Sequence, residues 1–243
     1  MSRKSARNRP TPESRAPQNE NPSKASGLSR RAIGIGVVAA LLVVLVAGYL
    51  LFKAEGTPSA ETGDGGNSAA LASEHSPALG NPNAKVHIVE FLDPACETCA
   101  QFFPLVKRWM ADNPDKIRLS VRHVAFHDGS EYVVRALEAS RKQDKYWQTL
   151  EALLMSQAQW APDHTAQPDL VLQAISGVGL NVEQLRVDMN APDVTQRMEQ
   201  DRSDAMTLKV TATPEYFVNG RPLPSFGEQQ LYSLILEELQ RAY

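Results

Sequence analysis

The longest apolar stretch of the chain runs from Ala32 to Phe52 and contains no charged side chain. A helix of this length, at ~1.5 Å per residue, is about 30 Å long and matches the hydrocarbon thickness of a bilayer. A cleaved signal peptide has a shorter apolar core, about 7–15 residues, that ends at small residues. This stretch ends in Tyr49-Leu50-Leu51-Phe52. We therefore expect a single uncleaved transmembrane anchor over 32–52.

Both flanks of the apolar stretch are polar and lack any apolar period. Residues 1–31 carry eight basic and two acidic side chains, whereas the whole chain of 243 residues has a net charge of −3. Basic flanks stay on the cytoplasmic side, so the remainder is expected in the periplasm or an equivalent extracytoplasmic space. We predict a disordered basic tail over 1–31 and a flexible linker over 53–80, which is rich in Gly, Ser, Ala and Thr. The near-neutral total gives no reason to propose nucleic-acid binding.

Periodic apolar positions become frequent after the linker, and we predict one domain over 81–243. Val86–Leu92 is β-branched and apolar and Ile117–Val124 alternates, so both predict strands. A helical pattern opens at Cys96 between them, and this order predicts a right-handed parallel β-α-β unit.

The second half of the chain is predominantly helical in pattern. An inserted helical block is expected over about 128–208, with helices over 131–141, 146–157, 169–177, 182–189 and 193–208, of which Asn181 and Asp193 are predicted caps. A short strand at 216–218, a tight turn at Asn219-Gly220 and a helix over 229–241 complete an α/β domain.

Cys96 and Cys99 are the only cysteines of the chain, and Glu97 and Thr98 separate them. A bridge across two residues constrains the unfolded chain little, which argues against a purely structural disulfide. A four-ligand zinc site would need a second Cys pair or a close His pair, which the sequence lacks, although a thiolate pair can bind Cu(I). We favour redox chemistry and expect no cofactor beyond the redox-active disulfide Cys96–Cys99.

The position of each group in the pattern suggests its role. A thiolate at a helix N-terminus is stabilised by the helix dipole, so Cys96 is expected to attack and Cys99 to resolve the mixed disulfide. Glu97 is expected to raise the pKa of Cys96 relative to a neutral residue, which makes a weaker oxidant. Glu90 is the one acidic residue in an apolar strand and is a candidate to move a proton to Cys99; a solvent-facing edge position is the alternative. His123, at a strand end, is a further candidate to stabilise the thiolate.

Two runs carry a resemblance to a known family. Val89-Glu90-Phe91-Leu92-Asp93-Pro94-Ala95-Cys96-Glu97-Thr98-Cys99, followed by Pro104, resembles the active-site strand and helix of the thioredoxin fold, and the helical block resembles the DsbA-like branch. Val210-Thr211-Ala212-Thr213-Pro214 resembles its cis-proline loop. The resemblance covers about residues 82–243. It implies a nucleophilic Cys96, a resolving Cys99, a buried acid at Glu90, and a cis Pro214 that follows Thr213 and faces the disulfide.

The resemblance also implies an activity, substrates and partners. It indicates a membrane-tethered thiol–disulfide oxidoreductase that acts on cysteine-containing exported proteins and is recharged by a membrane redox partner. Glu97-Thr98 and Ala212 depart from the common pattern of the family and leave oxidase, reductase and isomerase directions open. The alternatives are a Cu(I)-handling protein that uses the same thiols and a non-catalytic thioredoxin-like binding protein.

Overall fold

The computed structural model describes residues 65–71 and 74–243. The chain divides into two compact units, Met1–Ser59 and Ala60–Tyr243, and every described residue belongs to the second. Within the described ranges no helix is long and apolar enough to cross a membrane. The predicted basic tail over 1–31 and the predicted anchor over 32–52 lie outside these ranges.

The described part of the chain folds around a five-stranded sheet in the order β1-β3-β2-β4-β5. The strands are β1 (Ala78–Gly80), β2 (Val86–Leu92), β3 (Ile117–His123), β4 (Glu215–Val218) and β5 (Arg221–Pro222). β2 and β3 are parallel and the other pairs are antiparallel, which confirms the predicted β-α-β unit. Successive side chains of β2 point to opposite faces of the sheet and enter two separate cores. Ile88 and Leu92 belong to one core, and Val89 and Phe91 belong to the other.

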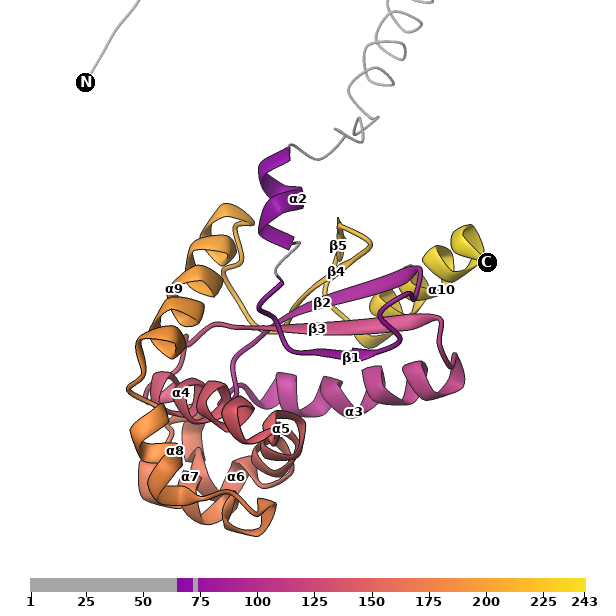
Figure 1. The fold of residues 1–243 in the computed structure, drawn as a ribbon. Coiled ribbons are helices and arrows are strands. Elements are labelled where there is room, and N and C mark those ends of the chain that lie inside the picture. The colour runs from indigo at the N-terminus through magenta and orange to yellow at the C-terminus, as the bar shows by residue number, and fades with distance from the viewer. Residues whose placement is uncertain (1–64, 72–73) are drawn as a thin grey trace, which may run out of the picture. The chain divides into compact units, whose positions relative to one another are not determined.

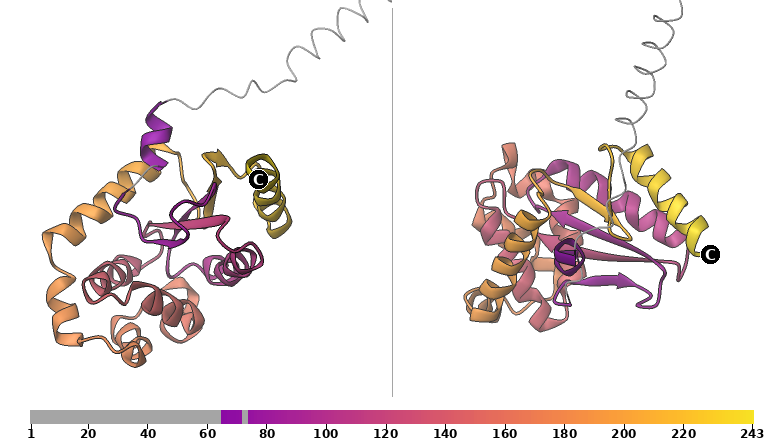
Figure 2. Two further views of the ribbon diagram at one scale, coloured as in Figure 1. Left: turned by 45° about the vertical axis from the view of Figure 1, so that its right-hand side comes forward. Right: turned by 90° about the horizontal axis from the view of Figure 1, so that it is seen from above.

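Helices cover both faces of this sheet, which explains why its central strands β2 and β3 are almost entirely buried. On one face, α3 (Glu97–Asp112) and α10 (Glu228–Ala242) lie against each other, with the Trp109 and Tyr232 ring centroids 5.2 Å apart. On the other face, α9 (Pro192–Thr207) contributes Ala205 to the core around Val89 and Phe91. Figure 2 shows α9 (orange) and α10 (yellow) on opposite sides of the sheet in both views.

The predicted helical block lies between β3 and β4 and forms a cluster beside the sheet (Figure 1). It contains α4 (Ser130–Ser140), α5 (Tyr146–Met155), α6 (Gln157–Trp160), α7 (Pro168–Ala174) and α8 (Val182–Asp188), with short 3₁₀ turns at Arg141–Gln143, Pro162–His164 and Ser176–Val178, and α9 leads back from it to the sheet. The Asn181 side chain caps α8, as predicted. Asp193 was expected to cap the next helix, but α9 begins earlier, because Pro192 fits the first helical turn and Ala191 precedes it.

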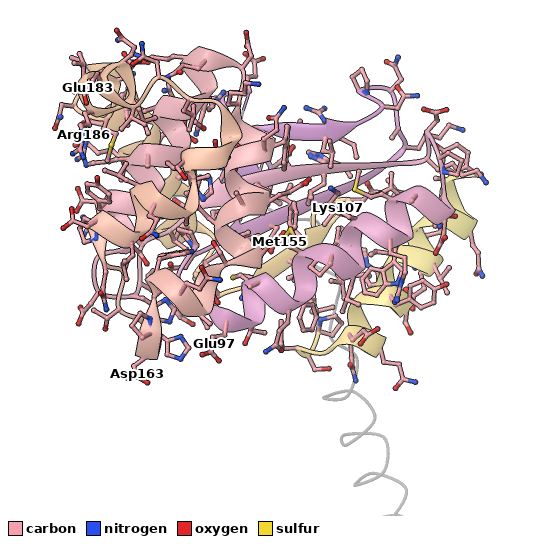
Figure 3. All side chains as sticks on the ribbon, turned by 90° about the horizontal axis from the view of Figure 1, so that it is seen from below. Glu97, Lys107, Met155, Asp163, Glu183 and Arg186 are labelled. Carbon is pink, nitrogen blue, oxygen red and sulfur yellow. The ribbon has the colours of Figure 1, made fainter. Side chains whose placement is uncertain are left out.

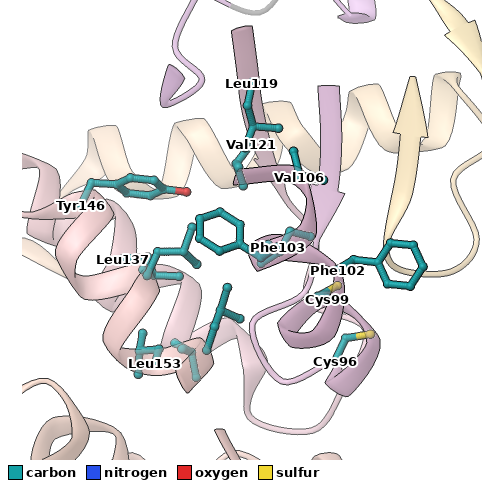
Figure 4. Packing of buried hydrophobic residues seen from close by; sticks show 14 of the residues in the cluster. Cys96, Cys99, Phe102, Phe103, Val106, Leu119, Val121, Leu137, Tyr146 and Leu153 are labelled. Atoms are coloured by element: carbon teal, nitrogen blue, oxygen red, sulfur yellow. The ribbon is translucent and has the colours of Figure 1, made fainter. Parts of the chain in front are cut away.

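The helical block and the thioredoxin-like sheet share one core through α3. Figure 4 shows Phe103 of α3 beside Leu137 and Tyr146 of the block. Lys107, labelled in Figure 3, forms an ion pair with Glu151 of α5. These contacts fix α3, which begins at the two cysteines, relative to the helical block.

The predicted flexible linker over 53–80 is wrong for its described part. Residues Gly65–Leu71 form helix α2, and Ala78–Gly80 pair with β3. The fully buried Arg122 of β3 explains why α2 is held in place. Arg122 donates to the Ala70 carbonyl at 2.7 Å and also pairs with Asp201 and Asp204 of α9. The small, polar composition of 65–80 concealed these contacts, which reach it from distant residues.

Candidate active site

Cys96 and Cys99 occupy the start of α3 (Figure 4). Cys96 is the residue before the first helical turn, in extended conformation, and its N–H donates to the Asp93 carbonyl at 3.0 Å. Both cysteines are free thiols. Cys96 is 6% exposed and Cys99 is fully buried, so the second cysteine is the more deeply buried of the two, as the sequence predicts.

The surroundings shift the two thiols in opposite directions. The hydrogen bond from Cys99 lowers the pKa of Cys96 to about 5, with further help from the Thr213 side chain and from the N–H groups of Cys99 and Thr98, against the opposing effect of burial. Burial raises the pKa of Cys99, and so do its hydrogen bond with Cys96 and the charge of Glu90. Near neutral pH the first sulfur is therefore a thiolate and the second a thiol.

Glu97 does not cancel this polarisation. Its side chain is exposed at the start of α3 (Figure 3). The hydrogen bonds to the Cys96 sulfur outweigh the opposing effect of burial, and the pKa of Cys96 is lowered with Glu97 in place. Whether a neutral residue at position 97 would give a still lower Cys96 pKa stays a prediction.

The loop before β4 faces Cys96. The Thr213–Pro214 peptide bond is cis, as the resemblance to the thioredoxin fold implies. The Cys96 thiol donates to the Thr213 carbonyl at 3.2 Å, although 117 positions separate the two residues. The structure thus brings together Cys96, Thr213 and Pro214.

Glu90 is fully buried in β2, which is a central strand of the sheet, so the alternative of a solvent-facing edge carboxylate is wrong. Its position two residues from both Ile88 and Leu92 places it on the face of the sheet that α3 covers. Tyr216 of β4 lies directly opposite and donates its hydroxyl to Oε1 at 2.9 Å. Burial raises the pKa of Glu90 to about 8; the Tyr216 hydrogen bond lowers it and the charge of Cys96 raises it.

His123 does not serve the thiolate, and that prediction is wrong. It is 2% exposed, and its Nε2 shares a hydrogen bond of 2.7 Å with the Tyr146 hydroxyl. Burial lowers the pKa of His123. The imidazole is therefore neutral near pH 7 and is directed at the helical block rather than at Cys96.

Sequence reasoning missed Asp93, which organises the turn before Cys96. This carboxylate is fully buried and accepts hydrogen bonds from the N–H groups of Ala95 (2.8 Å), Phe126 (2.7 Å) and His127 (2.9 Å) and from the Ser130 hydroxyl. The His127 ring lies 2.8 Å from the same carboxylate. The sequence did contain a signal for this role, because Asp93 is an acidic residue at the end of an apolar strand, three positions before Cys96.

Gln157 supports the same turn from the helical block. Its buried side-chain amide donates to the carbonyls of Pro94 (2.7 Å) and Cys96 (2.9 Å). No sequence pattern indicates this contact, because Gln157 is 61 positions away from Cys96. Within residues 65–71 and 74–243 no group of three or more His, Cys, Asp or Glu side chains is arranged to hold a metal ion.

Comparisons with known proteins agree with this geometry. A family model described as thioredoxin matches residues 72–236. A solved thioredoxin-like oxidoreductase from Silicibacter pomeroyi DSS-3 is similar, with 31% identity, a TM-score of 0.62, and coverage of 72% of this chain and 98% of that one. A probable disulfide bond formation protein D from Bacillus cereus is 26% identical over 200 residues, which are 79% of this chain and 90% of the relative.

A longer relative matches as well. The Na(+)/H(+) antiporter NhaA of Herminiimonas arsenicoxydans is 27% identical over 224 residues, which are 89% of this chain but 34% of the antiporter. The chain thus spans about a third of that relative's length.

A nearly buried cysteine with a lowered pKa and a fully buried one at a helix start, opposite a cis-proline loop, define a site for dithiol–disulfide exchange. With its inserted helical block, the chain belongs to the thioredoxin family and is a DsbA-like thiol–disulfide oxidoreductase.

Proposed function

We propose that Cys96 is the nucleophile and Cys99 the resolving thiol in disulfide exchange with cysteine-containing exported proteins. The observation that carries this proposal is the polarised pair: the Cys96 thiol has a pKa of about 5 and its sulfur lies 3.2 Å from the Thr213 carbonyl oxygen of the cis-proline loop, whereas Cys99 is fully buried. Thiolates rather than thiols attack disulfides. No cofactor is needed, because the two cysteines hold the electron pair themselves.

In the reductive half of the cycle, the Cys96 thiolate attacks one sulfur of a substrate disulfide and releases the other as a thiolate. Cys99 then gives its proton to Glu90 and attacks the Cys96 sulfur, which releases the second substrate thiolate. The Cys96–Cys99 disulfide forms as the substrate gains two electrons. The reverse sequence makes a disulfide in the substrate and returns the proton from Glu90 to Cys99.

The direction we propose is oxidation of the substrate. A low Cys96 pKa stabilises the dithiol form of the protein relative to its disulfide, and this makes the disulfide a stronger oxidant. The similarity to a probable disulfide bond formation protein supports the same direction. A membrane redox partner would then reoxidise the pair.

The loop at Thr213–Pro214 is proposed to hold the substrate. Its backbone lies beside Cys96, where an extended peptide can pair with free main-chain groups. A groove of about 610 Å³ runs along α4 and α9 and reaches Val210, three residues before Thr213. Its lining includes the apolar side chains of Phe126, Met206 and Val210 and charged side chains of both signs from α4 and α9. A polypeptide with apolar and charged side chains around its cysteine fits this surface better than a small thiol does.

The anchor over 32–52, with residues 1–31 in the cytoplasm, is proposed to hold the domain at the extracytoplasmic face of the membrane, and 53–64 to serve as the tether. The antiporter match supports this arrangement. A match over 89% of the chain begins at or before about residue 28 and so includes the apolar stretch. In that relative the corresponding residues belong to a protein whose name denotes transport across a membrane.

Trapping tests the proposal. Full-length Cys99→Ser, expressed in cells and collected with thiols blocked, should carry exported proteins as adducts that a reductant releases. The double variant Cys96→Ser with Cys99→Ser is the matched control and should carry none. An absence of adducts on Cys99→Ser, or equal amounts on the control, would contradict the assignment of Cys96.

A further inference from the structure

We infer that Tyr216 is a positioning residue that orients Glu90 for proton transfer with Cys99, an inference that rests on the proposed function and extends it. The phenol acts through the carboxylate rather than on the sulfur atoms. Three features of its surroundings lead to this role.

The first feature is the cross-strand geometry. Glu90 and Tyr216 are register partners in the antiparallel pair of β2 and β4, and both are fully buried. The Tyr216 hydroxyl donates to Oε1 of Glu90 at 2.9 Å. Side chains directly opposite each other on adjacent strands are close neighbours, so this hydrogen bond restrains the orientation of the carboxyl group.

The second feature is the remaining oxygen. Oε2 of Glu90 is buried and has no hydrogen-bond partner among the described residues. Buried polar atoms without a partner are rare and call for an explanation. A phenol has a single proton to donate, so Tyr216 occupies one carboxyl oxygen and leaves the other available for the exchange of a proton.

The third feature is the closeness of the thiol pair. Burial raises the pKa of Cys99, and the charge of Glu90 raises it further. Burial also raises the pKa of Tyr216, and the charges of Glu90, Cys99 and Cys96 add to this effect. Phe102, one turn after Cys99 on α3, packs against the Tyr216 ring with centroids 6.2 Å apart (Figure 4 shows Phe102). Tyr216, Glu90 and Cys99 therefore occupy one buried layer under the start of α3.

The chemistry follows from the direction of each effect. The Tyr216 hydrogen bond favours the carboxylate and lowers the pKa of Glu90 against a larger effect of burial. Without it, less carboxylate would be present near neutral pH to accept the Cys99 proton. Because the pKa of Tyr216 itself is raised, the phenol keeps its proton and remains a donor throughout the cycle.

A reagent that reports each step separately makes the inference testable. An aromatic disulfide, 5,5′-dithiobis(2-nitrobenzoate), releases one coloured thiolate when Cys96 attacks it and a second when Cys99 resolves the mixed disulfide. Stopped-flow absorbance of the reduced full-length protein therefore gives two phases. Loss of the first phase in the unmutated protein would overturn the proposed function, whereas the second phase reports on Glu90 and Tyr216.

Tyr216→Phe should slow the second phase about tenfold at pH 7, the order expected for loss of a hydrogen bond to a charged group, and should move its midpoint to higher pH. The first phase should keep its rate. Tyr146→Phe is the matched control, since Tyr146 is also buried and its hydroxyl also bonds one buried side chain, His123. The control should leave both phases unchanged.

A second variant separates positioning from a structural role. In Glu90→Gln the second phase should already be slow, and adding Tyr216→Phe should slow it no further. Two results would overturn the inference: a second phase in Tyr216→Phe with the rate and pH midpoint of the unmutated protein, or equal slowing in Tyr146→Phe. Additive slowing in the double variant would also overturn it.

Discussion

The Cys96 thiol lies 3.2 Å from the carbonyl oxygen of Thr213, and this contact joins the start of α3 to the loop before β4. The two residues come from opposite ends of the domain sequence. Because β2 and β4 are adjacent strands, the helix that follows β2 and the loop that precedes β4 meet at the same end of the sheet. The site is therefore a consequence of strand order.

Thr213→Val tests the side chain at this contact. The substitution removes the hydroxyl that helps to lower the pKa of Cys96 and leaves the carbonyl in place. We expect the Cys96 pKa to rise from about 5 toward its ordinary range, and the rate of its reaction with small disulfides at pH 5 to fall roughly threefold to tenfold. Ultraviolet absorbance of the thiolate during a pH titration measures the pKa. Thr211→Val, an exposed position in the same loop, should leave it unchanged.

Asp93→Asn tests the support of the turn before Cys96. The carboxylate accepts hydrogen bonds from three N–H groups, a hydroxyl and an imidazole. The asparagine amide replaces one of the accepting oxygens by an NH2 group, which would face these hydrogen-bond donors. We expect about 2–4 kcal/mol of lost stability, with slower disulfide exchange because Cys96 is displaced. Denaturant unfolding measures the first effect. The control is Asp128→Asn, an exposed carboxylate in the neighbouring loop; equal stability of the two variants would contradict the role of Asp93.

Glu90 should make the reduced protein less stable as pH rises. Its pKa is about 8 when folded, against an ordinary value of 4.5, so between these values the unfolded chain releases a proton that the folded protein retains. Glu90→Gln removes this effect. Relative to the unmutated protein, the variant should gain about 2–5 kcal/mol of stability between pH 4.5 and pH 8.

Urea unfolding of the reduced protein at several pH values measures how the free energy of unfolding changes with pH. Burying the amide of Glu90→Gln costs the same free energy at every pH and therefore does not alter this slope. Glu97→Gln replaces an exposed carboxylate and should keep the unmutated slope. Parallel stability curves for Glu90→Gln and the unmutated protein would show that Glu90 ionises normally in the folded state.

Arg122→Met tests the attachment of residues 65–80. The substitution leaves the buried Asp201 without its guanidinium partner and frees the Ala70 carbonyl. We expect a loss of about 3–5 kcal/mol and faster proteolysis within 65–80, measured by thermal unfolding and by mass spectrometry of the fragments. Arg118→Met, on the same strand but half-buried, serves as control. Unchanged proteolysis would indicate that α2 is held by other contacts.

Much of the fold follows from local pattern. The predicted strand over Val86–Leu92 and the predicted helix over 182–189 match β2 and α8 to within one residue. An apolar period of two or 3.6 is visible along the chain, and so is the turn at Asn219-Gly220. The cysteine pair was also recognisable, because its chemistry depends on spacing within a few residues, and the cis Pro214 followed from the resemblance to the thioredoxin fold.

The parts that could not be predicted depend on contacts between distant residues. Tyr216 is 126 positions from Glu90, and Gln157 is 61 positions from Cys96. Each looks like an ordinary core or helix residue in its own segment. Helix α2 was missed for the same reason: a buried arginine from β3 holds it, and its own composition is that of a linker.

The most direct test of the account is alkylation of the fully reduced protein with iodoacetamide across a range of pH, with each cysteine followed by peptide mass spectrometry. We expect Cys96 to be labelled with a midpoint near pH 5, since its pKa is about 5, while the buried Cys99 stays unlabelled. A Cys96 midpoint near the ordinary value of 9.0, or labelling of Cys99 as fast as Cys96, would contradict it.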